Sequence, residues 1–457
     1  MTTNAQMLSE EILLKVAGID DVGAMRQCLS GKKALILGAG DLVRKKAVWI
    51  ALLKLLGVDV YLADTRKNPV ALDLLSPYVS GFFVIDDGVE ERELIDIGRK
   101  EPFDILDIST WGDTHLAMAL RFQNIAKLIV DTKPVDTHLD LLRTIHKYIA
   151  NNSAIFGQLV SRLLVHDHYG GRWILPEAAK EMRRCHDTHG FVTSIQIYIL
   201  ESRAVNNERE RIDALRDGIA LDLMPHAFRV LQSMMPIGAT WVCGDLRYTR
   251  QNLSLSVVGG AREHNVGCII PGQIETFAAV SMEGQDIVQI DGQPSRPEHY
   301  PFRCLVAVGK GVTANHGDSK DVKGVAVKFE TGESLEIDLE SQRMRTPDGK
   351  VMLPPREILH RGINLPLIEL VKTGMTMPLP TNLTHFFQPL DEAYMAAELI
   401  DKARKLPWLG RAYTSGEGCV HMINSIPREW WGTTPWQLQG LPQIQIGDVL
   451  AETLIIP

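Results

Sequence analysis

The chain has 457 residues and a formal net charge of −8, with 45% hydrophobic and 23% charged residues. Its length suggests two or three domains, and its composition is ordinary for a soluble globular protein. The negative charge and the lack of a long basic block argue against nucleic acid or an anionic membrane as the main partner. No apolar run approaches the roughly 18 residues that a membrane-spanning helix needs.

The six cysteines are scattered and form no Cys-x-x-Cys pair. This favours reduced thiols over a disulfide framework. The opening residues, MTTNAQMLSEEILLK, are acidic and lack the apolar core of a secretion signal. We therefore expect a cytoplasmic protein, in which residues 1–31 form a helical extension ahead of the first domain.

The segment 33–64 has the pattern of a strand, a glycine turn, a helix and a second strand. Its turn contains Gly38 and Gly40, which let the backbone approach a pyrophosphate at the start of the helix. The second strand ends on Asp64, where an acidic side chain would reach a ribose hydroxyl. This order predicts a dinucleotide-binding unit.

The turn departs from the usual Gly-x-Gly-x-x-Gly pattern. Val43 stands in place of the third glycine, and Asp41 would put a carboxylate beside the phosphates or cap the helix instead. Lys45 and Lys46 could offset that charge or be plain solvated lysines. The alternative interpretation is a parallel-sheet turn that binds no nucleotide.

Apolar runs alternate with helical patterns up to about residue 150. Strands are expected at residues 81–85, 104–109 and 127–131, and helices at 71–78, 90–100 and 114–125. The short connections imply parallel pairing and right-handed crossovers, hence a doubly wound Rossmann sheet. Because such a sheet binds ligands at the carboxyl ends of its strands, we expect the cofactor to contact Gly38, Gly40, Asp41, Leu42, Asp64, Thr65, Arg66, Ser109, Thr110 and Trp111.

The pattern changes beyond residue 150. Alternating apolar and polar residues, separated by turn signals such as Glu330-Thr331-Gly332, are typical of antiparallel strands. Strands are expected at residues 192–201, 240–250, 253–258, 275–282, 302–312, 324–329 and 334–339, and an amphipathic helix at 391–405. The expected fold class is α/β, with a Rossmann domain at 32–150, an α+β substrate domain with an open, mostly antiparallel sheet at 151–405, and a tail rich in tryptophan at 406–457.

Two groups of residues could carry acid–base chemistry. Lys133 follows the last strand of the first domain, where a partly buried lysine can exchange a proton with a substrate hydroxyl; a surface lysine at a turn is the alternative. Asp222 and His226 lie at i and i+4 on one helix face, so the carboxylate can orient the imidazole as a general base. A metal site or a structural pair would show the same spacing.

A polar cluster follows the apolar run at residues 163–165. Histidine with arginine at a strand end suits a phosphate or carboxylate on a substrate, and a solvated loop is the alternative. The cluster consists of His166, Asp167, His168, Tyr169 and Arg172. The segment 185–189, CHDTH, offers metal-ligand types, but zinc needs several well-placed ligands and no second cluster is evident, so we expect no metal.

Motifs of the first domain resemble the glucose–fructose oxidoreductase/inositol dehydrogenase (Gfo/Idh/MocA) family. That family commonly has Thr-Pro, three residues and His, followed later by Glu-Lys-Pro. This chain has Thr110-Trp111 with His115, and then Thr132-Lys133-Pro134. A tryptophan thus replaces the proline of the first motif, and a threonine replaces the glutamate of the second.

The family's Asp-x-x-x-His helix motif is similar to Asp222–His226. The resemblance implies that Lys133, Asp222 and His226 are the catalytic set, and that His115 of the first motif lies at the cofactor. His226 would be the acid/base, and Lys133 would polarise or anchor the reacting hydroxyl.

Two further stretches are similar to glucose-6-phosphate dehydrogenases. GDLVRKK at residues 40–46 is similar to their Gly-Asp-Leu-x-x-(Arg/Lys)-Lys turn, and DHYGGR at 167–172 is similar to their Asp-His-Tyr-Leu-Gly-Lys substrate motif. This implies substrate-binding roles for His168, Tyr169 and Arg172, besides Lys133, and an anionic sugar. The helix motif is one residue shorter than theirs, which favours the broader family.

The cofactor choice depends on the end of the second strand. Asp64 would bond a ribose 2′-hydroxyl and repel a 2′-phosphate, which favours NAD, whereas Thr65, Arg66 and Lys67 could hold the 2′-phosphate of NADP. The expected function is an NAD(P)-dependent sugar or cyclitol dehydrogenase that binds a small-molecule substrate between its domains. Alternatives are an enzyme with tightly held NAD that epimerises, eliminates or cleaves a glycoside, and a non-catalytic dinucleotide-binding regulator. The resemblance also implies a homodimer or homotetramer.

Overall fold

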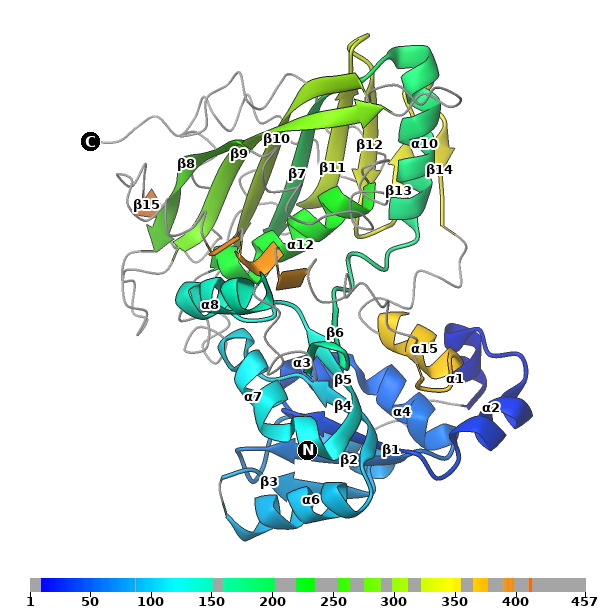
Figure 1. The fold of residues 1–457 in the computed structure, drawn as a ribbon. Coiled ribbons are helices and arrows are strands. Elements are labelled where there is room, and N and C mark those ends of the chain that lie inside the picture. The colour runs from blue at the N-terminus through cyan, green and yellow to red at the C-terminus, as the bar shows by residue number, and fades with distance from the viewer. Residues whose placement is uncertain are drawn as a thin grey trace. The chain divides into compact units, whose positions relative to one another are not determined.

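The chain divides into two compact units, Met1–Gly171 with Pro355–Leu390 and Arg172–Pro354 with Asp391–Pro457 (Figure 1). The computed structural model describes residues 10–86, 88–150, 159–201, 219–234, 254–263, 275–288, 298–310, 322–354, 365–376, 389–390, 392–394, 396–397 and 411–412. The strand expected at 240–250 lies outside these residues, as do most of the helix expected at 391–405 and most of the tail.

The first unit is built on a six-stranded sheet of order β3-β2-β1-β4-β5-β6, in which every pair is parallel. Its strands are β1 Lys33–Leu37, β2 Asp59–Asp64, β3 Gly81–Val84, β4 Phe103–Ile108, β5 Ala126–Thr132 and β6 Leu163–His166. The order reverses between β1 and β4, which is where a doubly wound sheet opens a ligand crevice. The predicted Rossmann sheet is confirmed. Its sixth strand, β6, lies beyond residue 150, the predicted end of the domain.

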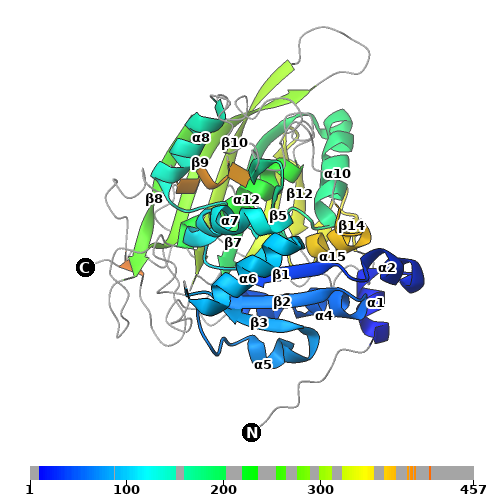
Figure 2. The same ribbon diagram turned by 60° about the horizontal axis from the view of Figure 1, so that its bottom comes forward.

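The first unit contains helices that connect the strands of this sheet, and further helices before β1 and after residue 354. They are α1 Glu10–Ala17, α2 Val22–Leu29, α3 Asp41–Lys45, α4 Ala47–Leu55, α5 Leu72–Leu75, α6 Val89–Lys100, α7 His115–Phe122, α8 Leu139–Ala150 and α15 Leu365–Lys372. Figures 1 and 2 show β1, β2 and β3 side by side, as the strand pairing requires. Where a single helix was expected between the glycine turn and Gly57, the chain forms α3 and α4, which meet at Lys46.

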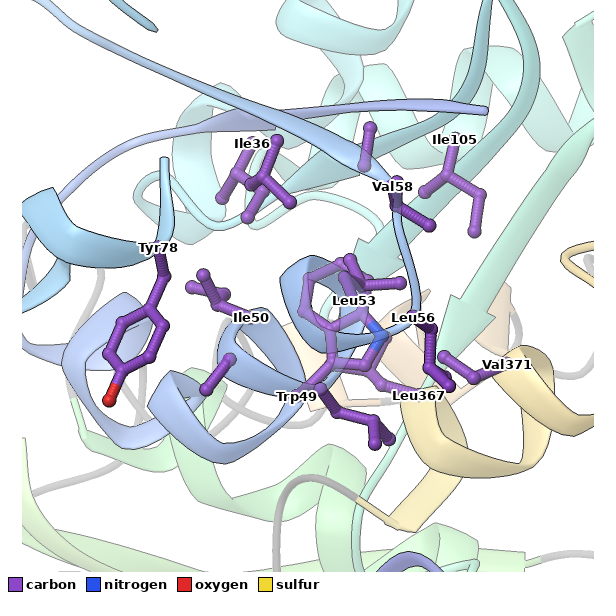
Figure 3. Packing of buried hydrophobic residues seen from close by; sticks show 14 of the residues in the cluster. Ile36, Trp49, Ile50, Leu53, Leu56, Val58, Tyr78, Ile105, Leu367 and Val371 are labelled. Atoms are coloured by element: carbon purple, nitrogen blue, oxygen red, sulfur yellow. The ribbon is translucent and has the colours of Figure 1, made fainter. Parts of the chain in front are cut away.

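One face of the sheet packs on α4. Ile36 and Ile105 belong to the same apolar cluster as the fully buried Trp49 of α4, and Val371 of α15 joins them (Figure 3). Successive strand residues point to opposite faces, so Asp107 points to the α4 face, as Ile105 does. The face to which each strand residue points therefore decides which helices its side chain contacts.

The second unit holds a nine-stranded sheet of order β14-β13-β12-β11-β7-β10-β9-β8-β15. Two pairs, β7–β10 and β8–β15, are parallel, and the other pairs are antiparallel. The strands are β7 Val192–Glu201, β8 Ser254–Glu263, β9 Glu275–Val288, β10 Glu298–Lys310, β11 Val322–Phe329, β12 Ser334–Asp338, β13 Arg343–Arg345, β14 Val351–Met352 and β15 Arg411–Ala412. The predicted open, mostly antiparallel sheet is confirmed.

Helices α10 Ile174–His189 and α12 Ile219–Met234 accompany this sheet. Helix α12 lies against β7, β9 and β10 (Figure 1). The predicted turn at Gly332 joins β11 to β12, with a left-handed φ of 90° at the glycine. Within the described part of the chain, no helix has both the length and the hydropathy of a membrane span.

Candidate active site

The glycine turn after β1 is fixed by its contacts with two neighbouring strands. Gly38 has a φ of 86°, and its N–H donates to Ala63 O of β2 at 2.7 Å. A Cβ built on Gly38 would lie 2.7 Å from the carbonyl oxygen of Ser109, just after β4. The backbone of the turn therefore touches both neighbours of β1 at the point where the strand order reverses.

Gly38→Ala is expected to lower the free energy of unfolding by at least about 1–2 kcal/mol, the cost of a left-handed φ for a residue with a Cβ, because the clash with Ser109 O adds to that cost. Gly40→Ala is the matched control. Gly40 has a φ of −86°, and its added Cβ would meet only Arg66 Nη2 at 3.6 Å. Urea unfolding of the two variants measures the difference, and equal stability would contradict this account of the turn.

Asp64 and Arg66 lie at the carboxyl end of β2. Asp64 is 5% exposed; its Oδ2 accepts from Ala39 N at 2.6 Å, and its Oδ1 accepts from Arg66 N at 2.9 Å and Arg66 Nε at 3.1 Å. The carboxylate expected to hold a ribose thus already holds the glycine turn and Arg66. The Arg66 side chain is 48% exposed, so a cation lies beside Gly40. Thr65 is exposed, Leu42 is half-buried, and the side chain of Asp41 lies outside the described part of the chain.

A fully buried lysine holds the carboxyl ends of β4 and β5 together. Lys46 Nζ donates to Asp107 Oδ1 at 2.8 Å and Oδ2 at 3.0 Å, to Ser109 Oγ at 2.7 Å and to Thr132 Oγ1 at 3.1 Å. Ser109 Oγ in turn donates to Asp107 Oδ2 at 2.9 Å. The interpretation of Lys46 as a solvated lysine is wrong. The Ser109 side chain, expected at the cofactor, is used by this network.

The network continues to β6 through a threonine and a histidine. Thr132 pairs with His166 across β5 and β6, and Thr132 Oγ1 lies 3.3 Å from His166 Nε2. Lys133 N donates to His166 O at 3.0 Å. Burial, and then the positive charge of Lys46, lower the pKa of His166 to about 3. The imidazole is therefore neutral at neutral pH.

On the other face of β5, His115 of α7 meets Asp131. His115 Nδ1 lies 2.7 Å from Pro134 O, and Nε2 lies 3.1 Å from Thr110 O. Asp131 Oδ1 is 3.1 Å from His115 Nδ1, but the hydrogen bond of Nδ1 is to the Pro134 carbonyl oxygen. Burial lowers the pKa of His115, and burial together with nearby Asp107 raises the pKa of Asp131. His115, expected at the cofactor, thus has both ring nitrogens at protein oxygens.

Lys133 lies between these two groups of contacts. It is 8% exposed and joined to Pro134 by a cis peptide bond. Gly112 packs on the ring of Pro134, where an added Cβ would lie 3.2 Å from Cγ. Trp111 beside it is 46% exposed. The structure therefore brings the glycine turn, Arg66, Trp111 and Lys133 to one edge of the parallel sheet.

The sequence-predicted substrate residues divide between the two units. His168 and Tyr169 follow β6, their ring centroids are 4.5 Å apart, and Tyr169 N donates to Asp167 Oδ1 at 2.7 Å. Arg172 belongs to the second unit, where it donates to Leu339 O and lies 3.8 Å from Glu340 Oε2. We therefore leave Arg172 out of the candidate site.

Glu340 belongs to a group of paired charges in the second unit. Burial alone would raise its pKa, but Lys323 and Arg172 outweigh burial and lower it. Lys323 also lies 3.3 Å from Glu201 Oε1. Two cations face two carboxylates here, so the group is balanced without an anionic ligand.

Helix α12 carries the expected acid–base pair. Asp222 and His226 lie one turn apart with Pro225 between them, Asp222 half-buried and His226 4% exposed. The neighbouring Met224 and Phe228 are buried, as their apolar character predicts. The second unit thus places the pair on the helix that packs against β7, β9 and β10.

No protein-family model and no curated protein sequence matches the chain. Levoglucosan dehydrogenase in complex with NADH and L-sorbose matches in fold, with a TM-score of 0.54, 11% identity, and 83% of this chain and 99% of that chain covered. A putative myo-inositol dehydrogenase from Sinorhizobium meliloti gives 0.50, 16% identity, and 81% and 98% coverage. Biliverdin reductase from Synechocystis in complex with biliverdin and NADP+ gives 0.50, 11% identity, and 80% and 98% coverage. The chain has the two-domain fold of these oxidoreductases, which confirms the expected resemblance at the level of the fold.

Proposed function

We propose that the chain is an NAD(P)-dependent oxidoreductase that transfers a hydride between the nicotinamide and a hydroxyl-bearing carbon of a sugar, sugar derivative or cyclitol. The observation that carries the proposal is the glycine turn at the reversal point of the sheet, where Gly38 leaves no room for a side chain against Ser109 O. The Gfo/Idh/MocA-like motifs support it. So does the fold shared with levoglucosan dehydrogenase and a putative myo-inositol dehydrogenase.

The residues of the turn fit a dinucleotide. Backbone N–H groups at the start of α3 suit a pyrophosphate, and the half-exposed Arg66 supplies a cation beside Gly40. Asp64 would hold the adenosine ribose, Thr65 and Arg66 would border its 2′ position, and Thr110 and Trp111 would border the nicotinamide. When bound, the nicotinamide accepts or donates the hydride.

The remaining chemistry falls to a proton carrier and an anchor for the reacting oxygen. We assign the proton to His226, oriented by Asp222, because an imidazole can exchange a proton near neutral pH. We assign the anchor to Lys133, whose ammonium can hold the oxygen as charge develops on it. His168 and Tyr169 are the proposed substrate contacts of the first unit.

Titration of the purified protein with NADH and NADPH, followed by intrinsic fluorescence, tests the proposal first. Binding of either dinucleotide, followed by reduction of NAD(P)+ with a member of a panel of polyols, sugar acids and sugar phosphates, is the expected result. Because a biliverdin reductase shares the fold, a linear tetrapyrrole should also be tested, as an acceptor of hydride from NAD(P)H. Binding without turnover on any member would favour a non-catalytic regulator, and no binding by protein freed of endogenous nucleotide would refute the proposal.

Arg66→Ala is expected to weaken NADPH binding by about tenfold or more and to spare NADH. A hydrogen bond to a charged group contributes about 1.5–3 kcal/mol, and only NADPH offers the 2′-phosphate to this guanidinium. Lys100→Ala is the matched control, since Lys100 is an exposed cation at the end of α6, away from the carboxyl ends of the strands. Equal losses for both dinucleotides would show that Arg66 acts instead by holding Asp64, and hence the turn.

A further inference from the structure

His166 has one ring nitrogen with no hydrogen-bond partner among the residues that the structure describes. The residue ends β6, is 5% exposed, and has Nε2 within 3.3 Å of Thr132 Oγ1. Among the described residues, none forms a hydrogen bond with its Nδ1. Buried polar atoms without a partner are rare and cost free energy in the folded state. We therefore expect a hydrogen-bond partner for this nitrogen at the strand edge that carries Lys133.

The hydrogens of the Lys46 network can be placed one by one. An ammonium only donates, and its three N–H bonds reach Asp107, Ser109 Oγ and Thr132 Oγ1. The Ser109 hydroxyl then donates to Asp107 Oδ2. Thr132 Oγ1 accepts from Lys46, so its own O–H remains to donate, and His166 Nε2 is the acceptor within reach.

This order of donors decides which nitrogen of His166 carries the proton. The ring is neutral, because burial and the charge of Lys46 lower its pKa to about 3. A neutral imidazole has one N–H and one lone pair. If Nε2 accepts from Thr132, the hydrogen is on Nδ1. The opposite tautomer would leave the Thr132 hydroxyl without an acceptor among the described residues.

We propose that the Lys46 network holds His166 as the Nδ1–H tautomer, and that this N–H donates a hydrogen bond to a carbonyl or hydroxyl oxygen of a ligand bound at the carboxyl edge of β5 and β6. The proposal rests on the proposed function for the identity of that ligand. The acceptor is the carboxamide oxygen of the nicotinamide or the reacting oxygen of the substrate. His166 pairs with Thr132 across β5 and β6, and its backbone carbonyl accepts a hydrogen bond from the Lys133 N–H. The proposed donor is therefore hydrogen-bonded to the backbone of Lys133, the proposed anchor.

Three variants separate a ligand-binding role from a purely structural one. His166→Gln keeps a polar group near the Nε2 position, toward Thr132, and loses the donor at Nδ1. His166→Asn keeps an N–H near the Nδ1 position and loses the contact with Thr132. His166→Phe keeps the ring shape and loses both. A structural role predicts that the Gln variant behaves best, whereas a donor to a ligand predicts that the Asn variant does.

The test combines ¹⁵N-histidine NMR of the ligand-free protein with titrations of NADH and ADP-ribose and with steady-state kinetics. The His166 signal, assigned by its absence in His166→Phe, should show the Nδ1–H tautomer, and Thr132→Val should mix the two tautomers. If the acceptor is the carboxamide, His166→Gln should weaken NADH binding by about tenfold and leave ADP-ribose unchanged. If it is the substrate, NADH binding stays unchanged and kcat/KM falls by a similar factor.

Several results would overturn the inference. The first is an Nε2–H tautomer of His166. The second is a His166→Gln variant equal to the wild type in binding and kinetics, which would mean that Nδ1–H donates to an internal water. The third is a His166→Asn variant as impaired as His166→Gln. A wild-type protein that binds neither dinucleotide would instead refute the proposed function, and with it the ligand named here. A wild type that binds and turns over while the Gln variant is unaffected refutes the inference alone.

Discussion

Lys46→Met is expected to lower the free energy of unfolding of the first unit by about 3–5 kcal/mol, the usual cost of removing one member of a buried ion pair. Lys46 and Asp107 are both 0% exposed, and their atoms approach to 2.8 Å. Without the ammonium, the carboxylate keeps only the Ser109 hydroxyl as a donor in this network. Equilibrium urea unfolding followed by circular dichroism measures the loss.

Two further variants make this prediction specific to the ion pair. Lys45→Met alters the exposed neighbour and should change stability by no more than about 0.5 kcal/mol. Lys46→Met combined with Asp107→Leu removes both charges, and replacing a buried pair by apolar residues is often neutral, so the double variant should regain most of the loss. A Lys46→Met protein as stable as Lys45→Met would show that the pair contributes nothing.

The positions of most strands could be predicted because apolar runs of strand length alternate with glycine or polar turns. β2, β4, β5 and β7 closely match the expected ranges, and the parallel order follows from their short helical connections. Among the strands that the pattern missed are β13, RMR, and β14, VM. Three and two residues are too few to show alternation, and these strands exist because β12 offers an edge to β13, and β13 offers one to β14.

The buried network could not be predicted from local sequence. Lysine is almost never fully buried unless it is paired, so the local sequence around Lys46 predicts a solvent-exposed side chain. Its partners Asp107 and Thr132 are 61 and 86 positions away, and they become neighbours only once β4 and β5 are placed in order. The available signal was a polar residue inside each of two apolar strands: Asp107 in FDILDI and Thr132 at the end of AKLIVDT.

The same reasoning explains why some side chains predicted to bind the cofactor form hydrogen bonds within the protein instead. Asp64 was predicted because it ends a strand and His115 because it completes the family motif, and both lie at the expected edge. Their hydrogen-bonding atoms, however, meet Ala39, Arg66, Thr110 and Pro134 of the protein. Position along a strand follows from sequence, whereas the direction and partners of a side chain depend on the whole sheet.

His226→Ala is expected to lower kcat by about a hundredfold or more, the usual contribution of a positioned general base, and to leave NAD(P)H affinity unchanged. The reason for the split is that His226 is on α12 of the second unit, whereas the glycine turn belongs to the first. Asp222→Asn should give a smaller loss in kcat, because the imidazole remains and only its orientation and basicity suffer. Fluorescence titration and steady-state kinetics on the substrate found by the panel measure the two quantities.

His189→Ala is the matched control, since His189 ends α10 in the same unit and lies 3.3 Å from Thr331 Oγ1. If His226 takes the hydroxyl proton, the wild-type rate of alcohol oxidation should fall at acid pH as the imidazole becomes protonated, and this acid limb should be absent from the residual activity of His226→Ala. Lys133→Met should lower kcat/KM and retain the acid limb, because the anchor for the oxygen is lost while the proton acceptor remains. Turnover of His226→Ala equal to that of His189→Ala, with the acid limb intact, would remove His226 from the proposed catalytic set. Lys133 would then be the remaining residue proposed to contact the reacting oxygen.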